Sequence, residues 1–227
     1  MLIEYLRKIP LFQHVLDDQM EEIAARCKRS SFKKGKVIFY KTDPSTDLYI
    51  VIAGRLKAVL EDEQGGEMVL AHFDEGDFFG ELGLIDGKGR SATIVADKDS
   101  ELAVLRKDGF LELMYKDPKI AVELMITLVD RLRKADDMIE SLAFLEVGER
   151  LVRTLLEVAQ DDEGGDLRFQ KVKKLTHKEL AARIGSSREA VSKCMKVLAA
   201  KGIIKEVEGS TSVARNAIEL LRESGRK

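Results

Sequence analysis

The sequence of 227 residues predicts an α+β protein with three parts in chain order. Between residues 32 and 106, short apolar stretches are divided by turn residues, which is typical of a β sandwich or jelly roll. Residues 118–145 follow one long helical pattern, and residues 176–198 have the spacing of a helix-turn-helix. We therefore expect a β domain over residues 1–117, a long helix over 118–145 and a winged helix-turn-helix domain over 146–227.

The periodicity of the apolar residues places the elements. Residues 1–30 show a helical period, broken at Pro10, and indicate short packing helices. Strands are expected over residues 37–40, 48–52, 55–60, 68–73, 93–96 and 102–105. A second helix should follow the long one over 146–158. Near the end of the chain, residues 203–207 and 210–213 around Gly209 are typical of the wing hairpin of a winged helix, and a last helix is expected over 216–223.

The composition is that of a globular protein, with 44% hydrophobic and 34% charged residues. No apolar run approaches the roughly 18 residues that a membrane span needs. Glu4 lies early and no small-residue cleavage site follows it, so we expect a cytoplasmic protein with no membrane partner. Cys27 and Cys194 are too few and too far apart for a disulfide framework or a thiolate metal site, which favours a buried free thiol at each.

The long helical pattern carries two apolar stripes. One includes Leu124 and Leu128, and the neighbouring one includes Met125 and Val129. Two stripes need two partners, so we expect one on the β domain and the other on a second copy in a homodimer. The alternative is one broad core face in a monomer. About 28 helical residues, roughly 42 Å by helical rise, would however overreach one small barrel.

Two charged residues, Arg131 and Asp136, interrupt these stripes. A charge in such a seam is costly unless it has a partner. Either the two residues satisfy each other across the dimer or they face a polar ligand.

Charge is divided unevenly along the chain. Residues 1–146 hold 21 Lys and Arg against 28 Asp and Glu, whereas residues 147–227 hold 17 against 12. The net charges of −7 and +5 are what a DNA-contacting module joined to a non-contacting body would show, although proteins that bind no nucleic acid can carry the same excess.

The glycine-rich stretch 79–93 predicts a sugar–phosphate site. Gly80 and Gly83 free the backbone to turn its N–H groups toward an anion. Glu81 can accept a hydrogen bond from a ribose hydroxyl, and Arg90 offers a planar donor fork that can neutralise a phosphate. We expect this stretch to form a loop, so Arg90→Leu should abolish the ligand response and leave the fold intact. The alternative is a glycine-rich hairpin with a surface ion pair.

The helix-turn-helix pattern begins with Thr176 and Glu179, which have the spacing of a capping box. Gly185 permits a tight turn, and the second helix is expected to start at Ser186 or Ser187. One side of that helix is apolar. The other is free to enter a DNA groove and carries Arg188, Glu189, Ser192, Lys193 and Lys196.

The chemistry of these side chains favours base reading. Arginine or lysine donates to guanine and glutamate accepts from cytosine, so a half-site containing G·C pairs is expected. The alternatives are a capping bond from Glu189 to Ser186, and solvated or phosphate-contacting roles for Lys193 and Lys196. We find no convergent set of acid, base, nucleophile or metal ligands, and His14, His72 and His177 are scattered, so we do not expect an enzyme or a metal site.

The run Phe79, Gly80, Glu81, Leu82, Gly83, followed by Arg90, Ser91 and Ala92, resembles the phosphate-binding cassette of cyclic-nucleotide-binding domains. Residues 142–145 and 187–189 also fall where the Crp/Fnr family of bacterial transcription regulators has matching segments. The resemblance covers nearly the whole chain and implies a cyclic-nucleotide-binding jelly roll, a dimerisation helix and a DNA-binding winged helix-turn-helix.

The resemblance also assigns roles to residues. An effector site is implied at Gly80, Glu81, Leu82, Gly83, Arg90, Ser91, Arg131 and Asp136, and DNA contacts at Thr176, Ser187, Arg188, Glu189, Ser192, Lys193 and Lys196. The partners would be a pseudo-palindromic double-stranded DNA, a second copy of the chain and RNA polymerase, which a loop near residues 161–166 can contact in this family. The cysteine cluster of iron–sulfur sensors is missing, and neither an iron–sulfur cluster nor haem is expected.

The expected effector is a cyclic nucleotide. Ala135 and Asp136 stand where the cyclic AMP receptor protein has its contacts to the adenine amino group. A carboxylate can accept from that group or from the guanine N1 and N2 donors, so cyclic AMP is ranked before cyclic GMP and the base stays open. Two alternatives remain: a regulator of the same fold that binds DNA without a nucleotide, and a signalling subunit whose helical module binds protein.

Overall fold

The computed structural model describes residues 2–63, 65–160, 166, 168–207 and 210–224. The chain divides into two compact units, one made of residues 1–60 and 69–135 and the other of residues 61–68 and 136–227. The boundaries at 117 and 145 stay a prediction.

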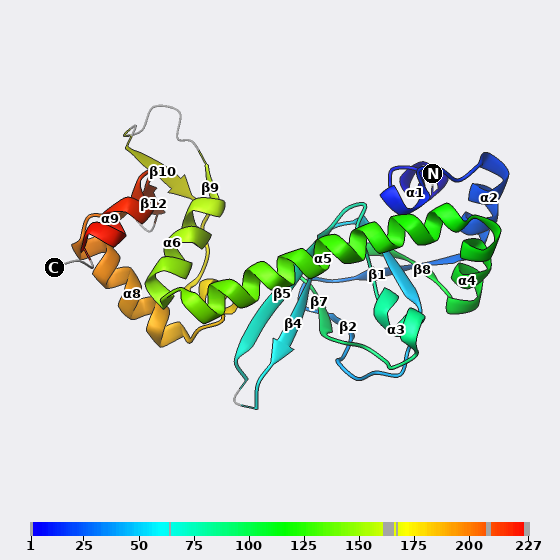
Figure 1. Cartoon of the computed structure of the whole chain (residues 1–227), viewed down its shortest axis with the longest axis horizontal. Coiled ribbons are helices and arrows are strands. Elements are labelled where there is room, and N and C mark those ends of the chain that lie inside the picture. The colour runs from blue at the N-terminus through cyan, green and yellow to red at the C-terminus, as the bar shows by residue number, and fades with distance from the viewer. Residues whose placement is uncertain (1, 64, 161–165, 167, 208–209, 225–227) are drawn as a thin grey trace. The chain divides into compact units, whose positions relative to one another are not determined.

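Two four-stranded antiparallel sheets form the body of the first unit (Figure 1). One has the order β1-β8-β3-β6 and contains Cys27–Phe32, Ser100–Leu105, Leu48–Ala53 and Phe78–Phe79. The other has the order β2-β7-β4-β5 and contains Val37–Phe39, Thr93–Ala96, Arg55–Glu61 and Glu67–Asp74. Buried residues of both sheets, among them Val51, Phe79 and Leu56, share one core. The expected jelly roll is confirmed.

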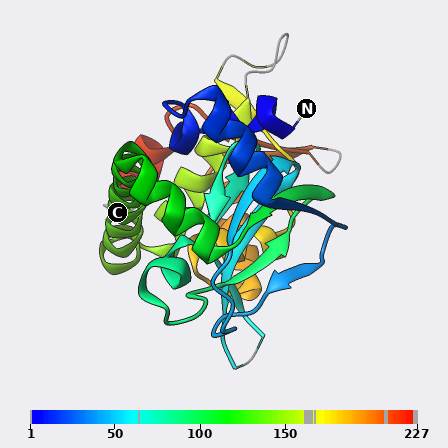
Figure 2. The same cartoon turned by 90° about the vertical axis from the view of Figure 1, so that its right-hand side faces the viewer.

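A second core joins one sheet to helices. The helices are α1 (Leu2–Leu6), the 3₁₀ helix Pro10–Phe12, α2 (Asp17–Arg26), α4 (Lys107–Lys116) and the first part of α5 (Pro118–Phe144). Phe12, Met20 and Phe110 are buried there beside Leu48 and Leu105. Figure 2 shows the N-terminal helices at one end of the strands. This core therefore anchors the beginning of the long helix on the β domain.

Two local expectations are wrong. A helical period was expected to continue through residue 30, but Cys27 begins β1, whose six residues pair in register with β8 from Cys27 opposite Leu105 to Phe32 opposite Ser100. A ladder with a distant strand overrides the local helical period here. The glycine-rich stretch is not simply a loop, because residues Glu81–Asp86 form the short helix α3.

Helix α5 runs over 27 residues, Pro118–Phe144, or roughly 40 Å, and confirms the expected long helix to within one residue. Ile120 and Leu124 are buried in the first unit. On other positions of the helix, large apolar side chains are exposed: Val122, Met125, Ile126, Val129, Leu132 and Ile139. The helix thus keeps one apolar stripe in its own core and presents another outward.

The second unit is a winged helix-turn-helix. Its helices are α6 (Val147–Glu157), α7 (His177–Ile184), α8 (Arg188–Ala200) and α9 (Ala217–Ser224), and its sheet has the order β11-β12-β10-β9 with strands Ile204–Val207, Ser210–Ala214, Phe169–Val172 and Ala159–Gln160. Leu151, Leu180, Val191 and Met195 lie in its core. The expected wing is the β11–β12 hairpin. Gly209 and residues 161–165 lie outside the described residues.

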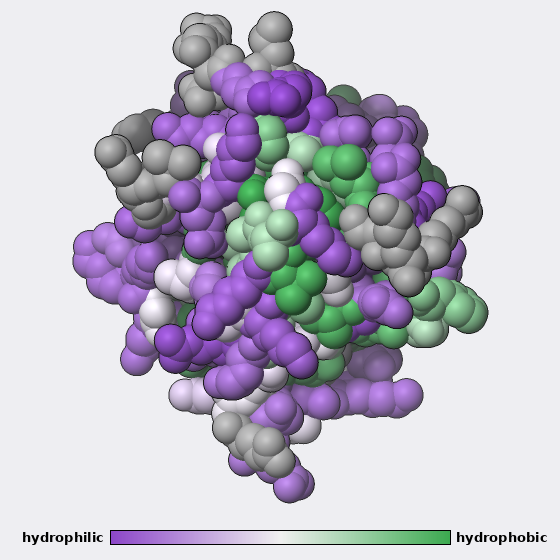
Figure 3. Space-filling model, turned by 90° about the vertical axis from the view of Figure 1, so that its left-hand side faces the viewer, coloured by the Kyte–Doolittle hydropathy of each residue, from purple (hydrophilic) through white to green (hydrophobic). Residues whose placement is uncertain are grey.

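The surface seen in Figure 3 is mainly hydrophilic, with smaller apolar areas between the polar side chains. Among the described helices, none is both long enough and apolar enough to cross a membrane.

Candidate effector site and nucleic-acid interface

Glycines shape the backbone of the predicted sugar–phosphate site, residues 79–93, which we call the cradle. Gly80 caps α3 with φ of 89° and Gly87 ends it with φ of 72°, both in the left-handed region that favours glycine. A Cβ on Gly80 would lie 2.5 Å from Nη1 of Arg90, and a Cβ on Gly83 would lie 2.7 Å from the Gly89 carbonyl oxygen. The first N–H groups of a helix have no partner within it, so the start of α3 offers donors at Leu82 and Gly83.

Arg90 is buried beneath this backbone, with 4% of its surface exposed. Its Nη1 donates to the Gly80 carbonyl at 2.8 Å, Nη2 to the Asp47 carbonyl at 2.9 Å and Nε to the Ser45 hydroxyl at 2.9 Å. Burial lowers the pKa of the guanidinium from its usual value. A guanidinium has more N–H donors than these bonds use, so Arg90 is a fixed positive charge with donors still to offer. The alternative of a surface ion pair is wrong.

Aromatic rings lie between Arg90 and the next arginine of the site. The Arg90 guanidinium lies 4.3 Å from the ring centre of Phe39 and 5.4 Å from that of Tyr49. Phe79 stacks on Tyr49 with ring centres 5.2 Å apart, and the ring centre of Phe73 lies 5.1 Å from that of Phe79. Cation–π contact and close packing hold Arg90 on a rigid support.

Glu81 is joined to the long helix. Glu81 is 4% exposed, and its carboxylate accepts a 2.7 Å bond from Nη1 of Arg131 on α5. Nη2 of Arg131 donates to the Phe78 carbonyl, and the guanidinium lies about 5 Å from the rings of Phe73 and Phe78. The partner of Arg131 is therefore Glu81 of the same chain. The sequence had led us to expect either Asp136 across a dimer or a polar ligand.

The structure brings Gly80, Glu81, Gly83, Arg90 and Arg131 together. Leu82 and Ser91 are exposed beside them in the sequence. Asp136 is exposed on α5 and belongs to the second unit, so its role at the site stays a prediction.

Sequence reasoning missed Ser45 and Asp47, whose loop anchors Arg90. That loop is also clipped to Arg90 by backbone bonds from Thr42 N to the Arg90 carbonyl and from Arg90 N to the Asp43 carbonyl. Its Asp, Pro, Ser and Thr composition signals only a turn.

The helix-turn-helix is capped as the spacing predicts. Thr176 accepts from the Glu179 N–H, and the Glu179 carboxylate accepts from the Thr176 N–H at 2.6 Å. Gly185 ends α7 with φ of 59°. The Ser187 hydroxyl caps α8 by accepting from the Ala190 N–H at 3.1 Å. Because Ser187 and not Ser186 is the cap, the capping alternative for Glu189 is wrong.

The outward face of α8 is polar. Arg188, Glu189, Lys193 and Lys196 are exposed and Ser192 is half-buried; together these residues line a shallow hollow of about 440 Å³. This is the side predicted to meet a DNA groove. The hydroxyl of Ser192 makes a 2.8 Å contact with Nδ1 of His177, the first residue of α7.

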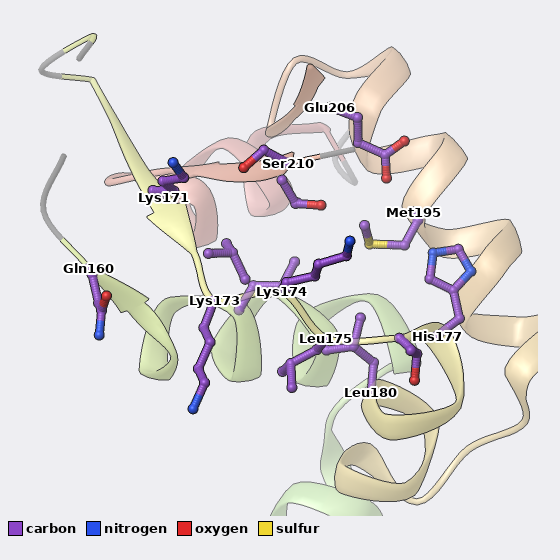
Figure 4. A pocket seen from close by; sticks show the side chains of 14 residues that line it. Gln160, Lys171, Lys173, Lys174, Leu175, His177, Leu180, Met195, Glu206 and Ser210 are labelled. Atoms are coloured by element: carbon purple, nitrogen blue, oxygen red, sulfur yellow. The ribbon is translucent and has the colours of Figure 1, made fainter. Parts of the chain in front are cut away.

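A larger cavity of about 710 Å³ lies beside the start of α7 (Figure 4). Lys171, Lys173 and Lys174 line it from β10 and the segment that follows, and Glu206 lines it from β11. His177 borders this cavity, while its partner Ser192 borders the hollow on α8. In the described part of the chain, no group of three or more His, Cys, Asp and Glu side chains is arranged to hold a metal ion.

Two family models match the chain. Residues 29–117 match the cyclic nucleotide-binding domain, and residues 149–223 match the Crp-like helix-turn-helix domain. The first match contains the cradle and the second contains α7, α8 and the wing.

Similar proteins span nearly the whole chain. The cAMP-activated global transcriptional regulator Vfr of Pseudomonas aeruginosa is 34% identical over 86% of this chain and 92% of its own length. The cyclic AMP receptor protein of Thermus thermophilus is 34% identical over 92% and 94%. Among solved structures, the c-di-GMP responsive regulator CLP of Xanthomonas campestris aligns with a TM-score of 0.76 and 27% identity over 87% of this chain and 98% of that one. The chain therefore belongs to the Crp/Fnr family, whose members are transcription regulators and not enzymes.

Proposed function

We propose that the chain is a homodimeric, DNA-binding transcription regulator whose affinity for DNA is set by a cyclic nucleotide, with cyclic AMP ranked first, and that it acts in the cytoplasm. The observation that carries this proposal is the pair of buried charges at the cradle. Arg90 is held under the glycines by neutral oxygen atoms of Gly80, Asp47 and Ser45, and Glu81 is tied to α5 through Arg131.

The residues of the cradle fit a cyclic nucleotide by chemistry. Its phosphate supplies a negative charge that would be held by Arg90, by the N–H groups of Leu82 and Gly83 and by the Ser91 hydroxyl. A charge-assisted bond of this kind contributes about 1.5–3 kcal/mol. Glu81 would accept from the ribose 2′-hydroxyl. The glycines keep the approach open, because a Cβ at Gly80 or Gly83 would collide with Arg90 or Gly89.

The Glu81–Arg131 contact supports coupling between ligand and helix. A ribose hydroxyl at Glu81 would compete with or reinforce the bond to Arg131, and Arg131 is part of α5. A ligand shifts a conformational equilibrium only if it binds one state better than the other. Contact with α5 supplies that difference if α5 takes two arrangements in the dimer.

The exposed apolar stripe on α5 supports the dimer. Met125, Val129 and Leu132 are between 48% and 62% exposed. Large apolar side chains repeated along one helix favour burial against a second helix, and a two-fold dimer would pack α5 against its copy.

The polar face of α8 supports DNA reading. Arg188 and Glu189 lie in its first turn, which in a helix-turn-helix meets the base edges of the major groove. Two such helices in a dimer would meet half-sites about one DNA turn, roughly 34 Å, apart on a pseudo-palindrome. The charge of the cavity beside α7 supports the same partner, because Lys171, Lys173 and Lys174 suit a phosphate backbone.

The identity of the base is the finer part of the proposal. Asp136 can accept from an adenine amino group or from guanine donors. Vfr and the Thermus thermophilus protein are named for cyclic AMP and CLP for c-di-GMP, so both of these nucleotides belong in one test with cyclic GMP. RNA polymerase remains a predicted partner, and the acidic segment 161–165 lies outside the described residues.

Calorimetric titration with cyclic AMP, cyclic GMP and c-di-GMP tests the effector, and selection from a randomised duplex DNA library with and without the binder tests the coupling. We expect heat with cyclic AMP and enrichment of a pseudo-palindrome that depends on it. If the same DNA is selected with and without a nucleotide, the result would favour a regulator of the same fold that binds DNA without a nucleotide. If the protein is not retained on DNA at low salt, the result would favour a signalling subunit whose helical module binds protein.

Replacing Arg188 with Ala separates base reading from phosphate contact. A lost bidentate base contact costs about 1–3 kcal/mol at the selected sequence and little on random DNA. Lys201→Ala, a change to an exposed lysine beyond the end of α8, is the matched control. Equal losses on both DNAs would show that Arg188 contacts only phosphate.

A further inference from the structure

The contact between His177 and Ser192 links the two helices of the helix-turn-helix through side chains. Nδ1 of His177 lies 2.8 Å from Oγ of Ser192. His177 is the first residue of α7 and Ser192 lies on the polar face of α8 with Arg188, Glu189 and Lys193. Both side chains are half-buried, so the hydroxyl has histidine on one side and the hollow on the other.

A serine hydroxyl has one hydrogen to donate and lone pairs to accept with. If Nδ1 carries a proton, it donates to Oγ, and the serine O–H is free to donate into the groove. If Nδ1 is bare, it accepts the serine O–H, and only lone pairs face the groove. The state of the histidine ring therefore decides whether Ser192 can donate a hydrogen bond into the groove.

These two states suit different bases. In the major groove, guanine O6 and N7, thymine O4 and adenine N7 accept hydrogen bonds, whereas the amino groups of adenine and cytosine donate them. A donating Ser192 can therefore bind guanine or thymine but not cytosine, an accepting Ser192 can bind cytosine but not guanine or thymine, and adenine suits both states. Protonated histidine carries hydrogen on both nitrogens, so its Nδ1 always donates to Oγ and leaves the serine O–H available to the groove.

Charged groups surround the pair from several elements. On its own helix, His177 is followed by Lys178 and Glu179, whose carboxylate is bonded to the Thr176 N–H. The cavity that His177 borders also holds Lys171, Lys173 and Lys174 and, from β11, Glu206 (Figure 4). From α8, Arg188, Glu189, Lys193 and Lys196 line the hollow with Ser192.

We propose that His177 is a positioning residue that sets the hydrogen-bonding direction of Ser192, and thereby the base preferred at one position of each half-site. Histidine ordinarily changes its protonation between about pH 5 and 8, so this preference becomes dependent on pH. The inference rests on the proposed DNA binding and adds to it the residue that tunes the sequence read.

The test is selection of duplexes from a randomised DNA library at pH 6 and pH 8, with the full chain and cyclic AMP present. We expect one position of the half-site to favour guanine or thymine more strongly at pH 6, by about fivefold, the factor given by one hydrogen bond of ordinary strength. The Ser192→Ala variant should bind the selected DNA but lose the preference at that position at both pH values.

Three histidine variants sharpen the result. His177→Asn keeps a hydrogen-bonding atom near the place of Nδ1 but does not titrate, so it should restore selectivity at that position without its dependence on pH. His177→Phe removes the bond and should behave as Ser192→Ala does, with no further loss in the double variant. His14→Asn, in the first unit and near Glu123, should leave the pH dependence of selection unchanged.

The outcomes separate the two proposals. If the wild-type protein selects a sequence whose base preferences are the same at pH 6 and pH 8 and in His177→Phe, the role of His177 is overturned while DNA binding stands. If the protein selects no sequence at either pH, the DNA-binding proposal itself fails. Thermal unfolding of each variant shows whether a lost preference reflects an unfolded helix-turn-helix, and His177→Asn decides the matter if His177→Phe does not fold.

Discussion

Glu81 and Arg131 lie 50 positions apart in the sequence and are joined by a 2.7 Å ion pair between the start of α3 and the middle of α5. Glu81 is nearly fully buried and Arg131 is partly exposed, so loss of Arg131 would leave the buried carboxylate without this ion-pair partner. The pair connects the glycine-rich cradle directly to the long helix through side chains.

Arg131→Gln should weaken that connection without removing the cradle. An amide can still donate to Glu81, and we expect the free energy of unfolding to fall by about 1–3 kcal/mol. Cyclic AMP should still bind through Arg90 but should no longer change the affinity for DNA. Calorimetry and DNA binding with and without cyclic AMP measure the two effects. Arg133→Gln, at an exposed position two residues along α5, is the matched control.

Arg90→Leu should abolish nucleotide binding and also destabilise the protein. From the sequence, Arg90 was expected on a loop where its loss would leave the fold intact. The structure corrects this, because Arg90 is buried and bonded to Gly80, Asp47 and Ser45. Each buried acceptor left without a donor costs about 1–3 kcal/mol, to be measured by denaturant unfolding. Lys88→Leu, in the same turn but exposed, should change neither quantity appreciably.

Gly83→Ala and Gly148→Ala should change stability in opposite directions. The new methyl at position 83 would meet the Gly89 carbonyl oxygen at 2.7 Å, whereas the one at position 148 meets nothing within 4 Å. We expect a loss of about 1–3 kcal/mol at 83 from overpacking and a gain of up to about 1 kcal/mol at 148 from helix propensity. Equal shifts in the unfolding midpoint would show that α3 is not held against residue 89.

Leu132→Glu should separate the dimer. Leu132 is 62% exposed on α5 and lies on the apolar stripe assigned to a second copy. A carboxylate buried in that seam without a partner costs several kcal/mol, so sedimentation at micromolar concentration should show a monomer with lost DNA affinity. Arg133→Glu also adds a carboxylate, next to the stripe. If both variants sediment as the wild type does, the stripe is not the dimer contact.

Cys27 should be a slow-reacting thiol in the folded protein. Burial raises its pKa to about 11, so on the order of 100-fold less thiolate is present at pH 8 than in the unfolded chain. Its reaction with iodoacetamide should therefore speed up sharply in denaturant. The raised pKa also means that the free energy of unfolding should fall as pH rises from about 9 toward 11, and Cys27→Ser should reduce that fall. Fast native alkylation at Cys27 would contradict the burial.

The elements that the sequence predicted well are those whose signal is local. The helix over Pro118–Phe144 and the turn at Gly185 follow from periodicity and from one left-handed glycine. β1 was missed because its pairing with β8 is a contact between segments some 70 residues apart in the chain, which no local pattern reports.

At the candidate site, residue types were predictable and their partners were not. Glu81 and Arg90 stand out by their place in a glycine-rich stretch, but nothing in the sequence pairs Glu81 with Arg131 or seats Arg90 on the Asp47 carbonyl. The contact of His177 with Ser192 is similar, since each residue alone is unremarkable on its helix. Partnerships of this kind depend on tertiary placement.

The anchoring of Arg90 has a consequence for selectivity. Its side chain is already ordered by Ser45, Gly80 and Asp47, so an incoming ligand loses little affinity to restricting the rotamers of that arginine. Because the Arg90 side chain is held in place, its guanidinium cannot move out into water when the bound ligand carries no charge. A neutral analogue of a cyclic phosphate should therefore bind more weakly than a charged analogue with an altered sugar.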